Sequence, residues 1–148
     1  MKKIYIGSDH AGFKLKEGLK EWMEHRKIPF EDVGDLVLNP VDDYPEYAEK
    51  VAKKVMRNKS KGILICGSGQ GVCIAANKIK GVRAVVPYLL KEVRLSRTDD
   101  DANVLCLSGW YIHTHKAMQM VEKFIHTPFS GAARHVRRLK KIQLLERS

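Results

Sequence analysis

Short runs of apolar residues alternate along the chain with longer amphipathic segments. Apolar runs bounded by turn residues are typical of buried strands, whereas apolar positions three and four apart are typical of helices that pack on one face. The pattern predicts strands at 3–7, 29–34, 62–66, 82–86 and 103–107, and helices at about 13–23, 44–58, 69–79, 88–97, 114–126 and 132–145.

The regular alternation of strands and helices indicates right-handed βαβ units that form one parallel sheet covered on both faces. We therefore expect a single α/β domain over residues 1–148, with a doubly wound, Rossmann-like, five-stranded parallel sheet. Ligands of such sheets bind beyond the carboxyl ends of the strands. Polar turns follow three of these ends, at 8–10, 66–71 and 108–111, and should converge in space.

The turn after the third strand carries candidate chemistry. The strand ends in Cys66, and three glycines then alternate with Ser68 and Gln70. Glycines let backbone N–H groups approach a ligand closely, and the start of the next helix adds partial positive charge, so an anion or a developing oxyanion would be stabilised there. The same field would favour the thiolate of Cys66, a candidate base or nucleophile. A buried, inert cysteine at a strand end is the alternative.

Nucleotide-binding motifs do not fit this turn. The glycines lack the GxGxxG spacing and no Lys-Ser/Thr pair follows them, so neither NAD nor ATP is predicted. Asp9 and His10, on the first polar turn, have three open interpretations: metal ligands, a proton-transfer pair, or a helix N-cap with a neighbouring histidine. His113 and His115 are expected at the surface. Because no third ligand is suggested, we expect no metal site.

Positive charge is concentrated near the C-terminus. The chain carries 27 Lys and Arg against 17 Asp and Glu, a formal charge of +10, and residues 131–148 hold six of these cations and only one acidic residue. Arg134 and Arg138 are four residues apart, so they share a helix face and could clamp a phosphate. A basic tail can also bind nucleic acid or a membrane surface, or be a solvated helix face.

The three cysteines, Cys66, Cys73 and Cys106, form neither a CxxC pair nor a metal-binding spacing. An odd number of cysteines suits a reducing compartment, so we expect a cytoplasmic protein. The apolar stretch at the N-terminus is too short for a signal peptide, and the sequence has no run of about 18 apolar residues that could span a membrane.

Several motifs cover nearly the whole chain in a specific order. They are Gly7-Ser-Asp-His-Ala-Gly-Phe13, Asp43-Tyr44-Pro45, Gly62 to Gly71, Ile74-Ala-Ala-Asn-Lys78, Gly81-Val-Arg-Ala84, Leu95-Ser-Arg97, Asn103-Val-Leu105 and Arg134-His-x-x-Arg138. In these motifs the chain resembles the ribose-5-phosphate isomerase B family, which includes the galactose-6-phosphate isomerase subunits. The resemblance implies an aldose-ketose isomerase of carbohydrate metabolism that needs no cofactor. Ribose 5-phosphate and ribulose 5-phosphate, of the pentose phosphate pathway, are the expected pair.

The resemblance also implies roles for individual residues. Cys66 would move a proton between C2 and C1 through a cis-enediolate, while Ser68 and the backbone of the turn hold the reacting oxygens. Two chains would share each site in a homodimer or tetramer, with the basic helix at 132–145 at the dimer interface. Asp99 takes a catalytic position, and the substrate-binding positions are Asp9, His10, Tyr44, Gly67, Gly69, Gln70, Gly71, Asp100, Asn103, Arg134 and Arg138.

Two places depart from the family pattern. Asp99 and Asp100 stand where members that open ribofuranose rings carry His-Asn. An ordinary aspartate is ionised at neutral pH, so it cannot give a proton to the ring oxygen. Trp110 stands where an arginine often binds the phosphate, and His113 or Lys116 are the candidates to compensate.

These departures leave several interpretations of function. The chain isomerises a pentose or hexose phosphate, with ring opening by another group or in solution. Alternatively, it acts on a four-carbon sugar phosphate, which has no free hydroxyl to close a furanose, or it pairs with a related subunit that supplies missing groups. In a different class, it is a non-catalytic protein that binds anions or nucleic acid, with steep dependence on salt. We expect the isomerase, with neither a nucleic-acid nor a membrane partner.

Overall fold

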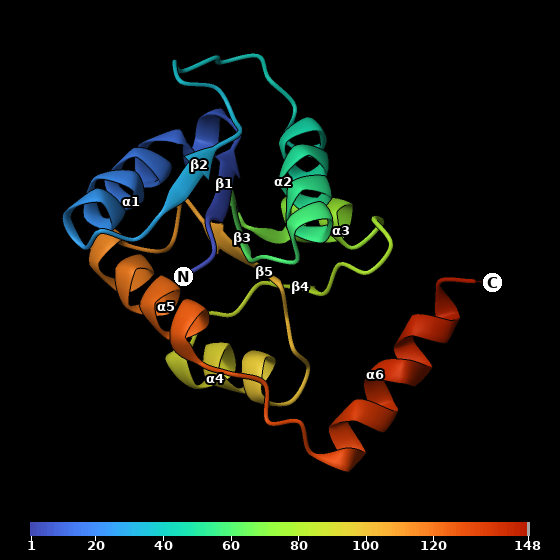
Figure 1. The fold of residues 1–148 in the computed structure, drawn as a ribbon. Coiled ribbons are helices and arrows are strands. Elements are labelled where there is room, and N and C mark those ends of the chain that lie inside the picture. The colour runs from blue at the N-terminus through green and yellow to red at the C-terminus, as the bar shows by residue number, and fades with distance from the viewer. Residues whose placement is uncertain (148) are drawn as a thin grey trace.

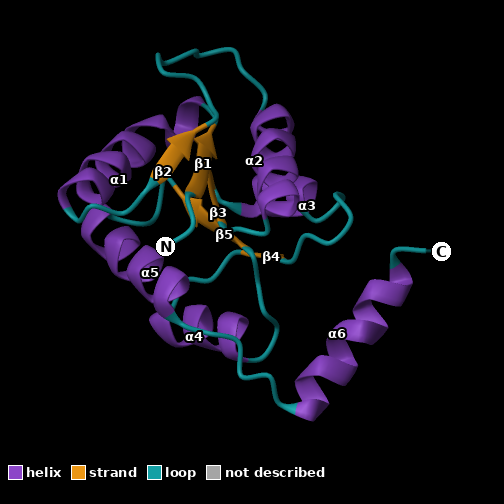
Figure 2. Cartoon of the chain, in the orientation of Figure 1, coloured by secondary structure: helices purple, strands orange, loops and turns teal. Residues whose placement is uncertain are grey.

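The structure is a computed structural model that describes residues 1–147. Five parallel strands form one sheet in the order β2-β1-β3-β5-β4, with helices on both faces, so the predicted doubly wound fold is confirmed (Figures 1 and 2). The strands are β1 (Ile4–Ser8), β2 (Phe30–Asp32), β3 (Gly62–Cys66), β4 (Ala84–Val85) and β5 (Val104–Ser108). The helices are the short 3₁₀ helix η1 (His10–Gly12), α1 (Phe13–His25), α2 (Tyr44–Asn58), α3 (Gln70–Ala76), α4 (Leu90–Thr98), α5 (Thr114–His126) and α6 (Ala133–Leu145).

Two apolar cores lie on opposite faces of the sheet because successive strand residues point to opposite sides. Ile63 and Ile65 of β3 pack in the core under α1, α4 and α5, whereas Leu64 and Cys66 pack in the core under α2 and α3. The strands β1, β3 and β5 are buried along their whole length. Such strands are continuous apolar runs, which is why the sequence pattern located them closely.

The winding of the sheet changes direction between β1 and β3. β2 lies on one side of β1, and β3 lies on the other side, paired with β1 from Gly62 opposite Tyr5 to Ile65 opposite Ser8. Loops that leave the carboxyl ends of two such strands diverge and leave room for a ligand. This switch point therefore places the turns at 8–10 and 66–71 next to each other.

The strand predicted at 82–86 is wrong in length, because β4 covers only Ala84–Val85. Asn77 takes the place of a neighbouring strand: its side-chain oxygen accepts from the Ala84 N–H at 2.8 Å, and its amide donates to the Ala84 carbonyl at 3.0 Å. The same contact accompanies the end of α3 at Ala76, before the predicted end at 79. The other predicted boundaries differ only slightly from those observed.

Candidate active site

Cys66 is the last residue of β3 and lies at the base of the glycine turn, residues 67–71. It is only 4% exposed, and its strand neighbour is Ser108, the last residue of β5. Gly69 has a φ of 81°, in the left-handed region, and directly precedes α3. The Ser68 hydroxyl accepts from the Gln70 N–H at 3.2 Å. The predicted arrangement of strand, tight turn and helix around the thiol is therefore present.

Two aromatic rings border the glycine turn. Trp110 lies against Gly67 and Tyr44 lies against Gly71, so closely that a methyl group added to Gly67 or Gly71 would be 2.5 or 2.6 Å, respectively, from a ring carbon. Trp110 is 66% exposed and Tyr44 is 39% exposed, so both rings also present surface to solvent. The departure at Trp110 thus replaces an expected positive charge with an apolar wall beside the turn.

Asp9 and His10 lie beside the glycine turn at the switch point. The Asp9 N–H donates to the Ile65 carbonyl at 3.3 Å. The Asp9 Oδ1 atom accepts from the Gly12 N–H at 3.1 Å, so the N-cap interpretation of Asp9 is confirmed. Burial raises the pKa of the Asp9 carboxyl. His10 is exposed, and a hydrogen bond to Asp42 raises the pKa of its imidazole. Groups with shifted pKa values beside a buried thiol mark this edge as a candidate active site.

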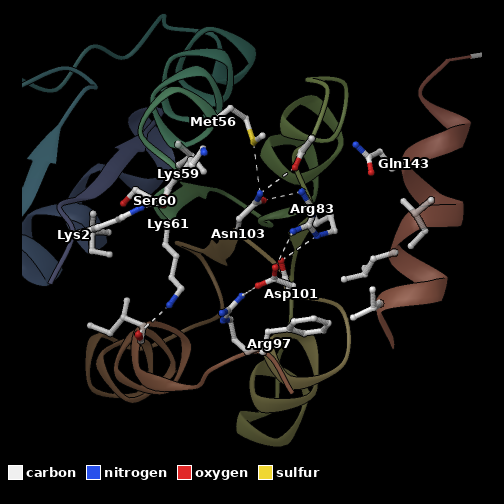
Figure 3. A pocket seen from close by; sticks show the side chains of 18 of the residues that line it. Lys2, Met56, Lys59, Ser60, Lys61, Arg83, Arg97, Asp101, Asn103 and Gln143 are labelled. Carbon is white, nitrogen blue, oxygen red and sulfur yellow. Dashed lines mark hydrogen bonds and ion pairs between the residues drawn. The ribbon is translucent and has the colours of Figure 1, made fainter. Parts of the chain in front are cut away.

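Other predicted residues lie at the opposite, amino edge of the sheet. Asp99 caps the C-terminus of α4, a crossover helix that runs back to this edge, and Asn103 directly precedes β5. The Asn103 side chain donates to the Gly81 carbonyl at 3.0 Å and accepts from the Arg83 N–H at 2.8 Å (Figure 3). Within this chain Asn103 therefore holds the start of β4 beside β5 and does not reach Cys66.

The three adjacent aspartates have different surroundings. Asp101 forms an ion pair with the largely buried Arg97 at 2.8 Å (Figure 3). Asp99 Oδ1 lies 3.8 Å from His135 Nε2 of α6, and Asp100 is exposed. The charge of Asp101 is therefore compensated within the chain, whereas Asp99 lies close to His135 of α6.

Arg134 and Arg138 are exposed on α6, which extends away from the sheet and from the glycine turn (Figure 1). A groove separates α6 from the body of the chain, and the α6 side of this groove includes Val136, Leu139 and Ile142. The other side is lined by residues that directly precede strands, among them Lys61, Arg83 and Asn103 (Figure 3), so the groove lies at the amino edge of the sheet. Within one chain, the glycine turn and the arginine pair consequently do not meet.

Comparison with known proteins identifies the family. A sequence model described as ribose/galactose isomerase matches residues 4–142. The chain belongs to the ribose/galactose isomerase family.

Within this family, a "Probable ribose-5-phosphate isomerase B" of Mycoplasma pneumoniae is 44% identical over 145 residues, which are 97% of this chain and 95% of the relative. A "D-erythrulose-4-phosphate isomerase 2" of Mycolicibacterium smegmatis is 38% identical over 130 residues, 86% of each chain. The crystal structure of ribose-5-phosphate isomerase B from Mycoplasma genitalium with bound ribulose-5-phosphate has a TM-score of 0.92 at 41% identity, and the match covers 99% of this chain and 97% of that one.

Two polar side chains near the site were not predicted from the sequence. Asp42 contacts His10, and Tyr47 lies behind it and donates its hydroxyl to Asp35 at 2.6 Å. Burial, together with Asp35 and Asp42, raises the pKa of Tyr47. The sequence did not indicate Asp42 as a site residue, because its loop lacks a periodic pattern. It did not indicate Tyr47 either, because this residue occupies an apolar helix position that is typical of core residues.

Residues 1–147 contain no cluster of three or more His, Cys, Asp or Glu side chains placed to hold a metal ion. Across the same part of the chain, no helix combines the length and the apolar character needed to cross a membrane. All three cysteines are free thiols. Cys73, on α3, donates to the Ala84 carbonyl at 3.4 Å and therefore points toward β4.

Proposed function

We propose that this chain is an aldose-ketose isomerase that interconverts ribose 5-phosphate and ribulose 5-phosphate without a cofactor. The observation that carries the proposal is the buried Cys66, which the glycine turn follows directly and which lies near Asp9 and His10 at the switch point. Relatives named ribose-5-phosphate isomerase B, which match along nearly the whole chain, support this choice of substrate.

In the proposed reaction, the Cys66 thiolate removes the proton from C2 of the open-chain aldose phosphate. The electron pair of that C–H bond forms the C1–C2 double bond, and the oxygen on C1 takes the negative charge. The thiol then returns a proton to C1, while the hydroxyl proton passes from O2 to O1, which leaves the ketone at C2. Backbone N–H groups of the glycine turn and the Ser68 hydroxyl stabilise the enediolate oxygens as charge develops.

The remaining groups of the site bind the substrate. Asp9 and His10 contact hydroxyls and the phosphate, and Tyr44 lines the site beside Gly71. We further propose that Arg134 and Arg138 bind the phosphate in the site of a second copy of the chain, in a homodimer. The opposite positions of the glycine turn and of α6 support this assembly, and so do the apolar side chains that α6 turns to an open groove.

A second candidate substrate is a four-carbon sugar phosphate. Asp99 replaces the histidine expected for ring opening, and one relative is named for D-erythrulose 4-phosphate. A substrate that cannot close a furanose ring would not need that histidine. Activity on erythrose 4-phosphate that exceeds activity on ribose 5-phosphate would favour this candidate.

Substitution of the thiol tests the proposed mechanism. We expect Cys66→Ala to lower kcat for ribose 5-phosphate at least about a thousand-fold, as loss of a general base does, while the Kd for the sugar phosphate changes little. Cys73→Ala is the matched control, because it removes a free thiol that faces β4, and it should keep near wild-type activity. An active Cys66→Ala enzyme would rule out the thiol as the base.

A panel of substrates tests the activity itself. If the wild-type protein isomerises none of the ribose, allose, galactose and erythrose phosphates, the homomeric isomerase is wrong. A non-catalytic protein would instead bind anions or nucleic acid with steep dependence on salt, and that binding would survive Cys66→Ala.

The free thiols support a cytoplasmic location, which we infer together with the absence of a membrane or nucleic-acid partner.

A further inference from the structure

A buried carboxylate lies directly behind the exposed His10. The Asp42 side chain is 4% exposed, whereas that of His10 is 43% exposed. Asp42 Oδ1 accepts from the backbone N–H of His10 at 3.0 Å and lies 2.8 Å from its Nδ1. One carboxylate oxygen therefore contacts both the main chain and the ring of the same histidine.

We propose that Asp42 is a positioning residue for His10: its Oδ1 accepts the Nδ1 proton and orients the imidazole, so that Nε2–H of the cationic ring is presented to the substrate phosphate. An ionised carboxylate only accepts hydrogen bonds, so Nδ1 must be the donor in this contact. Among residues 1–147, Nε2 makes no hydrogen bond or ion pair with another protein group. The inference rests on the proposed function, because it assigns His10 to the sugar phosphate.

The groups around His10 favour its cationic form. Asp42 approaches His10 from the loop before α2, and Asp9 directly precedes His10 in the first polar turn. The contact with Asp42 is the strongest influence that raises the pKa of His10, and the charge of Asp9 acts in the same direction. Tyr47 of α2 interacts with both Asp42 and Asp35, which helps to hold Asp42 in place.

A cationic His10 would bind a phosphate by a charge-assisted hydrogen bond, which is stronger than a neutral one. Loss of its proton would weaken substrate binding, while the proton transfer at Cys66 would continue. Asp42 is therefore expected to affect KM more than kcat, and to do so only at pH values where it changes the charge of His10.

The test compares wild type with Asp42→Asn and the matched control Asp35→Asn. The asparagine oxygen can still accept from the His10 N–H, so the loop keeps its anchor, but the charge is removed. Asp35 shares the Tyr47 contact and does not touch His10. NMR titration of the His10 ring should give a pKa above the ordinary value for histidine in wild type and in Asp35→Asn, and a lower one in Asp42→Asn.

Kinetics provide the second measurement. At a pH where only the wild-type His10 is cationic, Asp42→Asn should raise KM for ribose 5-phosphate about tenfold with kcat nearly unchanged, the effect of one lost hydrogen bond to a charged group. Lowering the pH should restore KM, because His10 becomes cationic in the variant too. A KM defect that persists at every pH, or that Asp35→Asn reproduces, would show a structural role and overturn the inference.

The NMR measurement separates this inference from the proposed function. If the protein isomerises no sugar phosphate, titration of His10 with and without inorganic phosphate still decides the role of Asp42. A wild-type His10 pKa at or below the ordinary value would overturn the inference even if Asp42→Asn did not fold. The inference would also be overturned if inorganic phosphate changed the His10 titration equally in wild type and in Asp42→Asn.

Discussion

The two glycines around Ser68 are required for different physical reasons. At Gly67 a methyl group would collide with the indole of Trp110, a ring that is largely exposed and has room to turn aside. At Gly69 the backbone is in the left-handed region, with φ of 81°, and a methyl group would be 3.0 Å from the backbone of Leu107. The restriction at Gly67 is set by a movable side chain, whereas the restriction at Gly69 is set by its own left-handed backbone and by the Leu107 main chain, together with Val86 Cγ2 at 2.9 Å.

Alanine at each glycine should separate these effects. We expect Gly69→Ala to lower the free energy of unfolding by more than about 2 kcal/mol, because crowding adds to the cost of the left-handed conformation. Gly131 has φ of 68° and open space around it, so Gly131→Ala should show the conformational cost alone, about 1–2 kcal/mol. Gly67→Ala should destabilise less than either and still reduce activity, because it displaces Trp110. Urea unfolding measures the stabilities, and equal losses at Gly67 and Gly69 would contradict this view.

Local motifs predicted one half of the site and missed Asp42. The thiol, the glycine turn and the Asp9-His10 pair could be predicted because each follows the end of an apolar strand, where the fold requires a ligand-facing turn. Asp42 and Asp43 are adjacent and identical in type. Only Asp42 is buried against His10, whereas Asp43 is exposed before α2 and its side chain makes no capping hydrogen bond. Which of the two turns inward depends on the path of the loop, which no sequence period specifies.

A buried lysine ties α1 to the second strand. Lys16 is fully buried on α1, and its ammonium group lies 2.9 Å from Asp32 Oδ2 of β2 and donates to the Asp35 carbonyl at 2.5 Å. Lys20, one turn later, reaches the same Asp32 oxygen at 2.9 Å. Although burial raises the pKa of Asp32, its hydrogen bonds to the two lysines outweigh this, and the pKa is lowered overall.

Removal of the Asp32 charge should therefore destabilise the fold in a manner that depends on pH. At pH 7 we expect Asp32→Asn to cost about 3 kcal/mol, because the buried Lys16 would lose its nearer counter-ion and keep only Glu17, at 3.9 Å. The pKa of Asp32 is lower in the folded state than in the unfolded chain, so its stabilisation is present above about pH 4 and is lost as the pH falls further. Urea unfolding should show the difference between wild type and variant shrinking in that range. Lys53 also lowers the pKa of Glu49, but this pair is exposed to solvent, so Glu49→Gln should show a much smaller change.

At the level of elements, periodicity predicted the type and the order of the helices and strands. Periodicity failed where side chains replace backbone hydrogen-bond partners. At β4, for example, the Asn77 side chain bonds both backbone groups of Ala84. An asparagine on a helix gives no sign in sequence that its amide will reach a strand. The burial of Lys16 could not be predicted either, because a lysine within an amphipathic segment is expected to face solvent.

The arrangement of the whole chain separates two groups of predicted site residues. The glycine turn lies at the carboxyl edge of the sheet, whereas Asp99 and the arginines of α6 follow elements that end at the amino edge. The sequence could predict both groups but not the distance between them within one chain. In the proposed dimer, the carboxyl edge of each copy would contact α6 of the other, because a two-fold axis repeats every contact in both directions.

Complementation between two inactive variants should test this assembly directly. Cys66→Ala removes the base from one group, and Arg134→Ala with Arg138→Ala removes the phosphate clamp from the other. In a hybrid dimer of these two chains, one site would carry all the defects and the other would be intact, so the purified hybrid should regain about half of the wild-type activity. Co-expression with two different affinity tags would isolate the hybrid, and a doubly tagged Cys66→Ala dimer is the control that must remain inactive. A hybrid without activity would place each complete site within a single chain, because every chain in it carries a defect.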